Sequence, residues 1–88
     1  MSDSPDLAAR LGQALALHRQ GRLDEAEALY RAVLAMVPDS ADALHLLGVI
    51  ALQRRDFEAA VRLIGEALQL NPNYAAALSN LASISPGP

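Results

Sequence analysis

Hydrophobic residues recur along the chain at intervals of three and four, the spacing of one face of an α-helix. The helix predicted over about 41–54 carries four of them: Leu44, Leu47, Gly48 and Ala51. A second helix, from about 57 to 70, carries an inner stripe of five: Ala60, Val61, Ile64, Ala67 and Leu68. The same spacing predicts helices over about 23–37 and 74–84, and one that starts at Ser4 and Pro5. We therefore expect an all-α chain of five helices.

Polar and special residues mark the ends of these helices. Ser40 and Asp56 have side chains that accept hydrogen bonds from the first turn of a helix, so we expect both to be N-caps. Gly21 adopts positive φ freely and suits a tight connection. Pro72 ends the helix before it, because the residue that precedes a proline avoids helical dihedrals. Arg54–Arg55 are placed at a helix C-terminus, where the dipole favours positive charge.

The pattern repeats with a period of 34 residues, the interval between Pro38 and Pro72. At the same offset Ala26 matches Ala60, and the segment after Pro72 begins the pattern again. This periodicity divides the chain into five segments: an N-terminal arm (1–6), a first repeat (7–40), a second repeat (41–74), the first helix of a third repeat (75–84) and a tail (85–88). Each repeat forms a helical hairpin that cannot bury its apolar face alone, so we expect the hairpins to stack.

The repeat resembles the tetratricopeptide repeat, in which a Leu-Gly pair, an alanine, an aromatic residue and a proline recur every 34 residues. One repeat matches through Leu47-Gly48, Ala60 and Pro72, and the other through Ala26, Tyr30 and Pro38. The resemblance implies a right-handed α-α superhelix, or solenoid, of five antiparallel helices that make two and a half repeats. It also implies that small residues stand where the two helices of a hairpin approach: Ala14, Gly48 and Ala82, opposite Ala26 and Ala60.

In this family the first helices of successive repeats line a concave groove that holds a partner segment. Carried over by position, the groove residues are Leu11, Leu15, His18, Arg19, His45, Val49, Leu52, Gln53, Ser79, Asn80 and Ser83. The resemblance implies a scaffold for protein–protein interaction whose partner is a protein or peptide. The alternative for Leu11 and Leu15 is that they pack within the array or against residues 1–6.

Two stretches, GRLDEAEALYRAVL and ALHLLGVIALQ, resemble the repeats that precede catalytic domains in bacterial relatives of O-GlcNAc transferase. The alternative function is therefore a regulatory or substrate-docking arm of a larger bacterial enzyme such as a glycosyltransferase. Some family members clamp a terminal carboxylate with groove lysines and asparagines, but every basic residue here is an arginine. We do not expect that kind of clamp.

Charge and composition exclude several other classes. The formal charge is −3, and the seven arginines are spread along the chain, so no basic stripe exists to contact a row of phosphates. The sequence has no cysteine, no apolar run of membrane-spanning length and no apolar signal segment in its acidic N-terminus. We therefore expect a cytoplasmic protein that binds neither nucleic acid nor membranes.

No pattern of catalytic residues is visible, and we expect neither enzymatic activity nor a cofactor. His18 and His45 are the two histidines, and their repeat positions are about 10 Å apart along parallel helices, so a shared metal site is not expected. Both are predicted to be partly exposed. The acidic residues Asp24, Glu25 and Glu27 open a helix and are interpreted as structural. Glu27–Arg31 and Glu58–Arg62 are expected ion pairs.

The two ends of the array differ in polarity. Arg10 and Gln13 replace leucines of the second repeat, which fits an N-terminal cap that faces water. Tyr74 is expected to pack on the preceding hairpin, and Tyr30 and Phe57 are expected in the packed interior. Because two and a half repeats are fewer than the usual three, the chain is predicted to be a fragment of a longer protein or to bury its remaining apolar surface by self-association.

Overall fold

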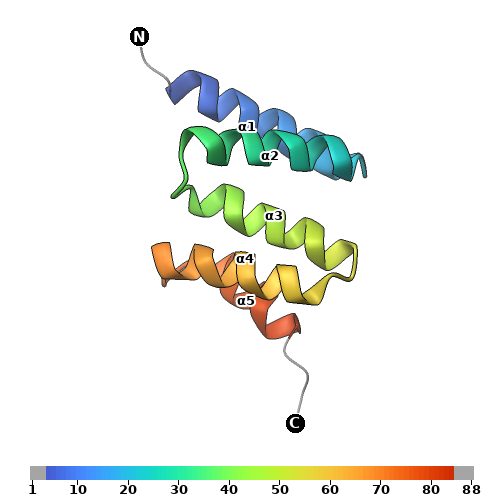
Figure 1. Ribbon diagram of the computed structural model, residues 1–88, viewed down its shortest axis with the longest axis vertical. Helices are drawn as coiled ribbons and strands as arrows, with labels where there is room; N and C mark the ends of the chain where they lie inside the picture. The colour runs from blue at the N-terminus through green and yellow to red at the C-terminus, as the bar shows by residue number, and fades with distance from the viewer. Residues whose placement is uncertain (1–3, 85–88) are drawn as a thin grey trace.

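The structure, a computed structural model, describes residues 4–84, with side chains from residue 7 onward. That part of the chain contains five helices and no strand: α1 (Ser4–Arg19), α2 (Leu23–Met36), α3 (Ala41–Gln53), α4 (Phe57–Leu70) and α5 (Ala75–Ile84). The helices stack one after another along the longest dimension of a body of 51 × 27 × 18 Å (Figure 1). The all-α helical repeat is thus confirmed. α1 begins inside the segment predicted as an arm, whereas residues 1–3, the tail 85–88 and the side chain of Ser4 lie outside the description.

The predicted helix ends are found where local chemistry placed them. The Ser40 hydroxyl accepts a hydrogen bond from the N–H of Ala43 at 3.2 Å, and the Asp56 carboxylate accepts one from the N–H of Ala59 at 3.3 Å. Gly21 has a φ of 81° in the turn between α1 and α2. One repeat later the same left-handed conformation is adopted by Arg55, with a φ of 64°, which the sequence pattern did not predict.

The interior consists of two clusters, and each joins one hairpin to the first helix of the next. In the first cluster, buried residues of α1 and α2 meet two of α3: Ala14, Ala26, Tyr30, Leu47 and Ile50. In the second, one residue of α3 meets two of α4 and one of α5: Ala51, Ala60, Ile64 and Ala77. Because α3 contributes to both clusters, its two sides are covered and it is the central element of the stack.

Small residues allow the helices of a hairpin to approach closely. A Cβ atom added to Gly48 would lie 2.5 Å from Cγ1 of Ile64, so α3 and α4 are in direct contact there. One repeat earlier the same pair of positions holds Ala14 and Tyr30, both completely buried. The third member of the small set, Ala82, is exposed, because no helix that the structure describes follows α5.

Two residues expected in the interior are instead exposed. Phe57 is 48% exposed and Val61 is 44% exposed. Leu23, at the register of Phe57, is partly buried against the first cluster. The difference arises because Leu23 packs against the first cluster, which includes residues of α3, whereas Phe57 is not among the side chains packed against the second cluster.

Charged side chains connect α2 to the end of α3. Arg54 forms an ion pair with Glu27 at 2.6 Å and another with Asp24. Arg31 binds Glu27 at 2.8 Å, as predicted from their spacing. These arginines lower the pKa of Glu27 through hydrogen bonds to its carboxylate, first from Arg54 and then from Arg31. The pair predicted between Glu58 and Arg62 is absent from the ion pairs of residues 7–84.

Candidate functional site

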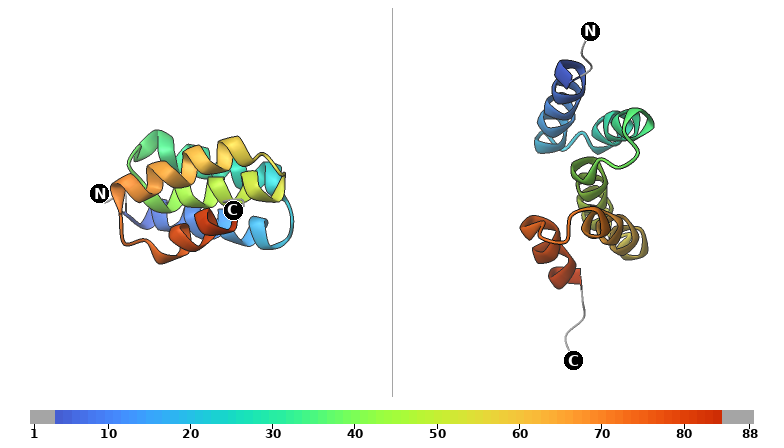
Figure 2. Two further views of the ribbon diagram at one scale, coloured as in Figure 1. Left: turned by 90° about the horizontal axis from the view of Figure 1, so that it is seen from below. Right: turned by 90° about the vertical axis from the view of Figure 1, so that its left-hand side faces the viewer.

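The first helices of the repeats, α1, α3 and α5, lie on one side of the molecule, and α2 and α4 lie on the other. The right-hand view of Figure 2 shows α1 and α5 to one side of α3, with α2 and α4 across from them. We call the side made by α1, α3 and α5 the first-helix face. Polar side chains connect neighbouring helices across it, α1 to α3 through His18 and Gln53, and α3 to α5 through His45 and Asn80.

His18 is held between two partners. Its Nε2–H donates to Oε1 of Gln53 at 2.5 Å, and its Nδ1 lies 3.2 Å from the hydroxyl of Tyr30. In the neutral imidazole the Tyr30 hydroxyl is then the donor to Nδ1. The two rings also make an edge-to-face contact, with centroids 6.0 Å apart. His18 therefore links the first-helix face to the interior, because Tyr30 is completely buried.

His45 occupies a different environment and is only 5% exposed, which corrects the prediction that both histidines lie partly exposed in the groove. Asn80 donates from Nδ2 to His45 Nε2 at 2.8 Å, so the proton of the neutral ring is on Nδ1. That Nδ1 is buried and has no hydrogen-bond partner in the described part of the chain. Burial lowers the pKa of His45, and the nearby Asp42 carboxylate opposes this effect.

Tyr74 covers His45 and connects α5 back to α3. Its ring lies against the imidazole, with centroids 4.9 Å apart, and its hydroxyl donates to Oδ1 of Asp42 at 2.7 Å. Burial, and then the hydrogen bond to Asp42, raise the pKa of Tyr74. The sequence predicted that Tyr74 packs on the preceding hairpin, and its contacts with His45 and Asp42 of α3 confirm this. It gave no signal for Asp42, because the two residues are 32 positions apart and follow no repeat spacing.

The other predicted groove residues lie on α1, α3 and α5 and differ in exposure. Six are partly buried: Leu11, Leu15, His18, Val49, Leu52 and Asn80. Four are exposed: Arg19, Gln53, Ser79 and Ser83. At one repeat position Leu15, Val49 and Ser83 follow one another along the stack. The apolar part of the first-helix face is therefore on α1 and α3, and its end on α5 is polar.

A hollow of about 280 Å³ opens where α1 meets the turn between α2 and α3. Its apolar walls include Leu7, Leu11 and Val37, and polar groups from Asp42 and Asn71 lie at its edge. Of these, only Leu11 was predicted as a groove residue. The others belong to helix ends and turns, where the repeat pattern does not distinguish residues that line a hollow from residues that are merely exposed.

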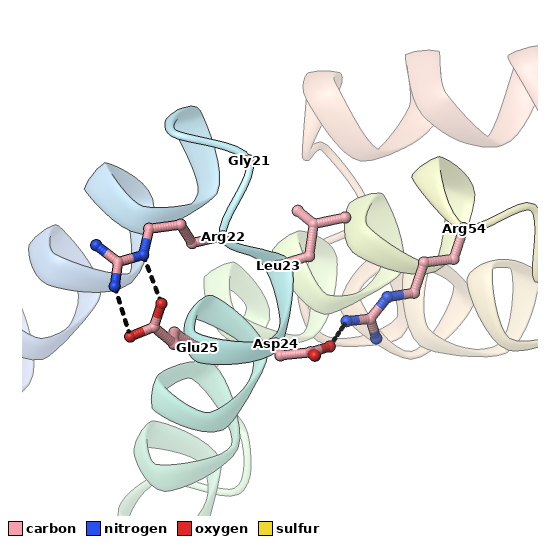
Figure 3. A pocket seen from close by; sticks show the side chains of 6 residues that line it. All are labelled: Gly21, Arg22, Leu23, Asp24, Glu25 and Arg54. Carbon is pink, nitrogen blue, oxygen red and sulfur yellow. Dashed lines mark hydrogen bonds and ion pairs between the residues drawn. The ribbon is translucent and has the colours of Figure 1, made fainter.

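A second, shallower hollow of about 420 Å³ lies at the start of α2 (Figure 3). Arg22 and Glu25 bind each other there through two hydrogen bonds, and Arg54 points to Asp24. The charges of these side chains are thus neutralised within the protein, which leaves the hollow without a charged group directed at a ligand. This agrees with the structural interpretation of the acidic residues at the start of α2.

Among residues 4–84, no group of three or more histidine, cysteine, aspartate or glutamate side chains is arranged to hold a metal ion. None of the helices in that range combines the length and apolar character needed to cross a bilayer.

The repeat geometry agrees with a family comparison. The model of the family described as tetratricopeptide repeat matches residues 2–41, 11–75 and 45–85. This chain belongs to the tetratricopeptide repeat family. It is similar to the Protein CTR9 homolog of Arabidopsis thaliana, with 34% identity over 79 residues that represent 86% of this chain and 7% of that protein. The chain thus spans a small part of the length of this relative. Tetratricopeptide repeats generally mediate protein–protein interactions and are typically non-enzymatic scaffolds.

Proposed function

We propose that the chain binds a segment of another protein on the first-helix face, with its main apolar contact at Leu15 and Val49. The observation that carries this proposal is the arrangement of that face. Leu15 of α1 and Val49 of α3 are both partly buried and occupy the same repeat position, about one turn before His18 and Gln53, whose side chains join the two helices. Aliphatic contacts supply affinity, and fixed polar groups give orientation.

The proposed partner segment is mixed in polarity. Its apolar side chains contact α1 and α3, and the hollow beside Leu11 accepts one aliphatic side chain from its end. Its polar part lies over Ser79 and Ser83 on α5, which are exposed and uncharged. His45 takes no direct part, because its ring is covered by Tyr74 and bonded to Asn80.

A peptide-display selection against the intact chain tests this proposal. The selected peptides are then measured by fluorescence anisotropy against the double variant Leu15→Asp and Val49→Asp. We expect the dissociation constant to rise by about tenfold or more, because each carboxylate is placed in an apolar contact. The control is Val61→Asp, which puts the same charge on an exposed apolar position of α4. Circular dichroism confirms that the variants fold.

The proposal is wrong if peptides bind the double variant as tightly as the native chain, or if Val61→Asp weakens binding equally. The alternative role as a docking arm of a larger bacterial enzyme stays a prediction, as does self-association. Neither the family match nor the first-helix face favours one of them.

A further inference from the structure

Two hollows follow each other along α4, on the side of the molecule opposite the first-helix face (Figure 2). The first, of about 130 Å³, is lined by α2, α3 and α4, and the second, of about 520 Å³, by the turn between α2 and α3 and by residues of α3 and α4. The residues that α4 contributes to them share one face of that helix: Ala59, Arg62, Leu63, Glu66, Gln69 and Leu70. We call the two hollows together the second-helix groove.

The floor of the second-helix groove is apolar and rigid. Leu44, Leu47 and Ile50 of α3 line it and are at most 6% exposed, so the packing of both repeats fixes their side chains. Leu63 and Leu70 of α4 add aliphatic walls, and Leu70 is 47% exposed. Residues 27–70 form the whole groove, so its shape belongs to the two repeats and is independent of the ends of the stack.

The hollow nearer the start of α4 carries an excess of positive charge, although the formal charge of the protein is −3. Three of the seven arginines and two carboxylates line it: Arg31, Arg54, Arg62, Glu27 and Asp56. Both carboxylates are already engaged, Glu27 by Arg31 and Arg54, and Asp56 as the N-cap of α4. The charge that is left without a counter-ion in this hollow is that of Arg62.

Arg62 could be neutralised by its own helix but is not. Glu58 and Glu66 stand four positions before and after it, and neither forms an ion pair with it in residues 7–84. Glu66 instead lines the second hollow together with Asp39, and in the same part of the chain no arginine pairs with either carboxylate. The second-helix groove therefore has a positive end, a negative end and aliphatic surface between them.

This arrangement of charge defines the occupant. A carboxylate is complementary to Arg62, and a lysine is complementary to the other end, where its aliphatic stem packs on Leu70 and its ammonium reaches Asp39 and Glu66. The floor runs from Leu44 to Arg54, about 15 Å at the rise of an α-helix, so the two charges of the occupant are about two turns apart. The positive N-terminus of a helix also suits the negative end, which gives the occupant the direction of α3.

We infer that the second-helix groove binds an amphipathic helix of a partner protein, with a lysine near its N-terminus, a glutamate about two turns later and leucines between them. This surface is distinct from the first-helix face, so the inference does not depend on the proposed function. The uncompensated charge of Arg62 selects the glutamate, and the carboxylates of Asp39 and Glu66 select the lysine.

A capped peptide of the sequence AALKALLAALEALA is the probe, because its lysine and glutamate lie two turns apart on a leucine-lined face. It is titrated at low salt into the ¹⁵N-labelled chain, and amide shifts are recorded. We expect the largest shifts at Arg62, Leu63 and Glu66, and weaker binding as salt is added, since the charges are exposed. The double variant Leu15→Asp and Val49→Asp should bind the probe like the native chain.

Arg62→Glu should raise the dissociation constant of the probe by about fivefold or more, because attraction is replaced by repulsion. A second peptide, in which lysine replaces the glutamate, should bind Arg62→Glu more tightly than it binds the native chain. The matched control is Arg10→Glu, which makes the same change of charge at an exposed position of α1 and should leave the binding of both peptides unchanged.

Several results overturn the inference. The probe causes no shifts, or its shifts are centred on Leu15 and Val49, which would place it on the first-helix face. Equal losses with Arg62→Glu and Arg10→Glu would show a response to net charge alone, and failure of the second peptide to restore binding would remove the contact with Arg62. A dimer of the chain alone that Arg62→Glu dissociates would assign the groove to a second copy.

Discussion

At the scale of single residues, the two repeats use different amino acids at the same left-handed position of the turn between their helices. The turn between the helices of a hairpin requires a left-handed residue, which is Gly21 in the first repeat and Arg55 in the second. A side chain with a Cβ atom is strained in this conformation, by about 1–2 kcal/mol relative to right-handed geometry, whereas glycine is not. At position 55, therefore, the native arginine is less favourable for folding than glycine would be.

We expect Arg55→Gly to raise the free energy of unfolding by about 0.5–1 kcal/mol, since the strain is removed while glycine costs some entropy in the unfolded chain. Urea denaturation followed by circular dichroism measures the change. The reciprocal control is Gly21→Ala, which should destabilise the protein by a similar amount. If Arg55→Gly leaves the stability unchanged or lowers it, the left-handed turn is not a source of strain.

The buried His45 should make the stability of the fold decrease as the pH falls. Its pKa in the folded chain is lowered from the ordinary 6.5, chiefly by burial, so the unfolded chain binds more protons in the interval below 6.5. Stability is then complete above about pH 6.5 and decreases as the pH falls below that value, until the folded-state pKa is reached. The groups that face the ring are Asp42 on its own helix and Tyr74 and Asn80 beside or on α5.

Urea midpoints measured between pH 5 and 7.5 check this dependence, with His45→Gln as the comparison. The glutamine does not titrate and retains a polar group near Asn80. We expect its stability to change less with pH than that of the native chain across this interval. Parallel curves for the two proteins would show that another group is responsible.

At the scale of helices, α3 and α4 approach so closely at Gly48 and Ile64 that a Cβ atom on Gly48 would lie 2.5 Å from Ile64. The pair Ala14 and Tyr30 makes the equivalent contact between α1 and α2, where the aromatic ring leaves room for a methyl group. The small residue thus differs with the side chain opposite it: glycine stands opposite Ile64, and alanine stands opposite Tyr30.

Gly48→Ala should destabilise the protein by about 1–3 kcal/mol, although alanine favours a helix, because the new methyl group would lie 2.5 Å from Ile64. Gly65→Ala is the matched control, since a Cβ atom there meets nothing within 4 Å. That variant should gain about 0.5–1 kcal/mol from helix propensity alone. Thermal unfolding of both variants tests the packing, and a stabilising Gly48→Ala would refute it.

At the scale of the whole molecule, the stack is stabilised unevenly. α3 has seven buried residues, from Ala43 to Ala51, because it is packed on two sides. α5 has one, Ala77, and α1 is likewise covered mainly on the side that faces α2. In a repeat array each unit is stabilised by its neighbours, so the terminal helices open at a lower free energy than the central one.

Amide hydrogen exchange should therefore show the slowest exchange in α3 and the fastest in α5. Protection in α4 should lie between them, because its first turn, at Phe57, is exposed. Equal protection along the whole chain would mean that the five helices unfold as one cooperative unit.

The sequence by itself determined the helices, their ends and the repeat. Ser40, Asp56 and Gly21 act on atoms within a few residues of themselves, and the period between Pro38 and Pro72 requires no knowledge of the fold. The face to which α1, α3 and α5 contribute was implied by the resemblance of that repeat to the tetratricopeptide repeat. These features are local or repeated, so one sequence was sufficient to predict them.

Only the tertiary structure decided which side chains of that face are available. His45 is buried because Tyr74, 29 positions later, covers it, and Phe57 is exposed because it does not pack against the second cluster. Arg54 stands at the C-terminal end of α3 as predicted, and its side chain also binds Asp24 and Glu27 on α2, which the sequence did not predict. Burial and charge pairing depend on what the neighbouring repeat contributes, and two repeats with the same spacing contribute different residues.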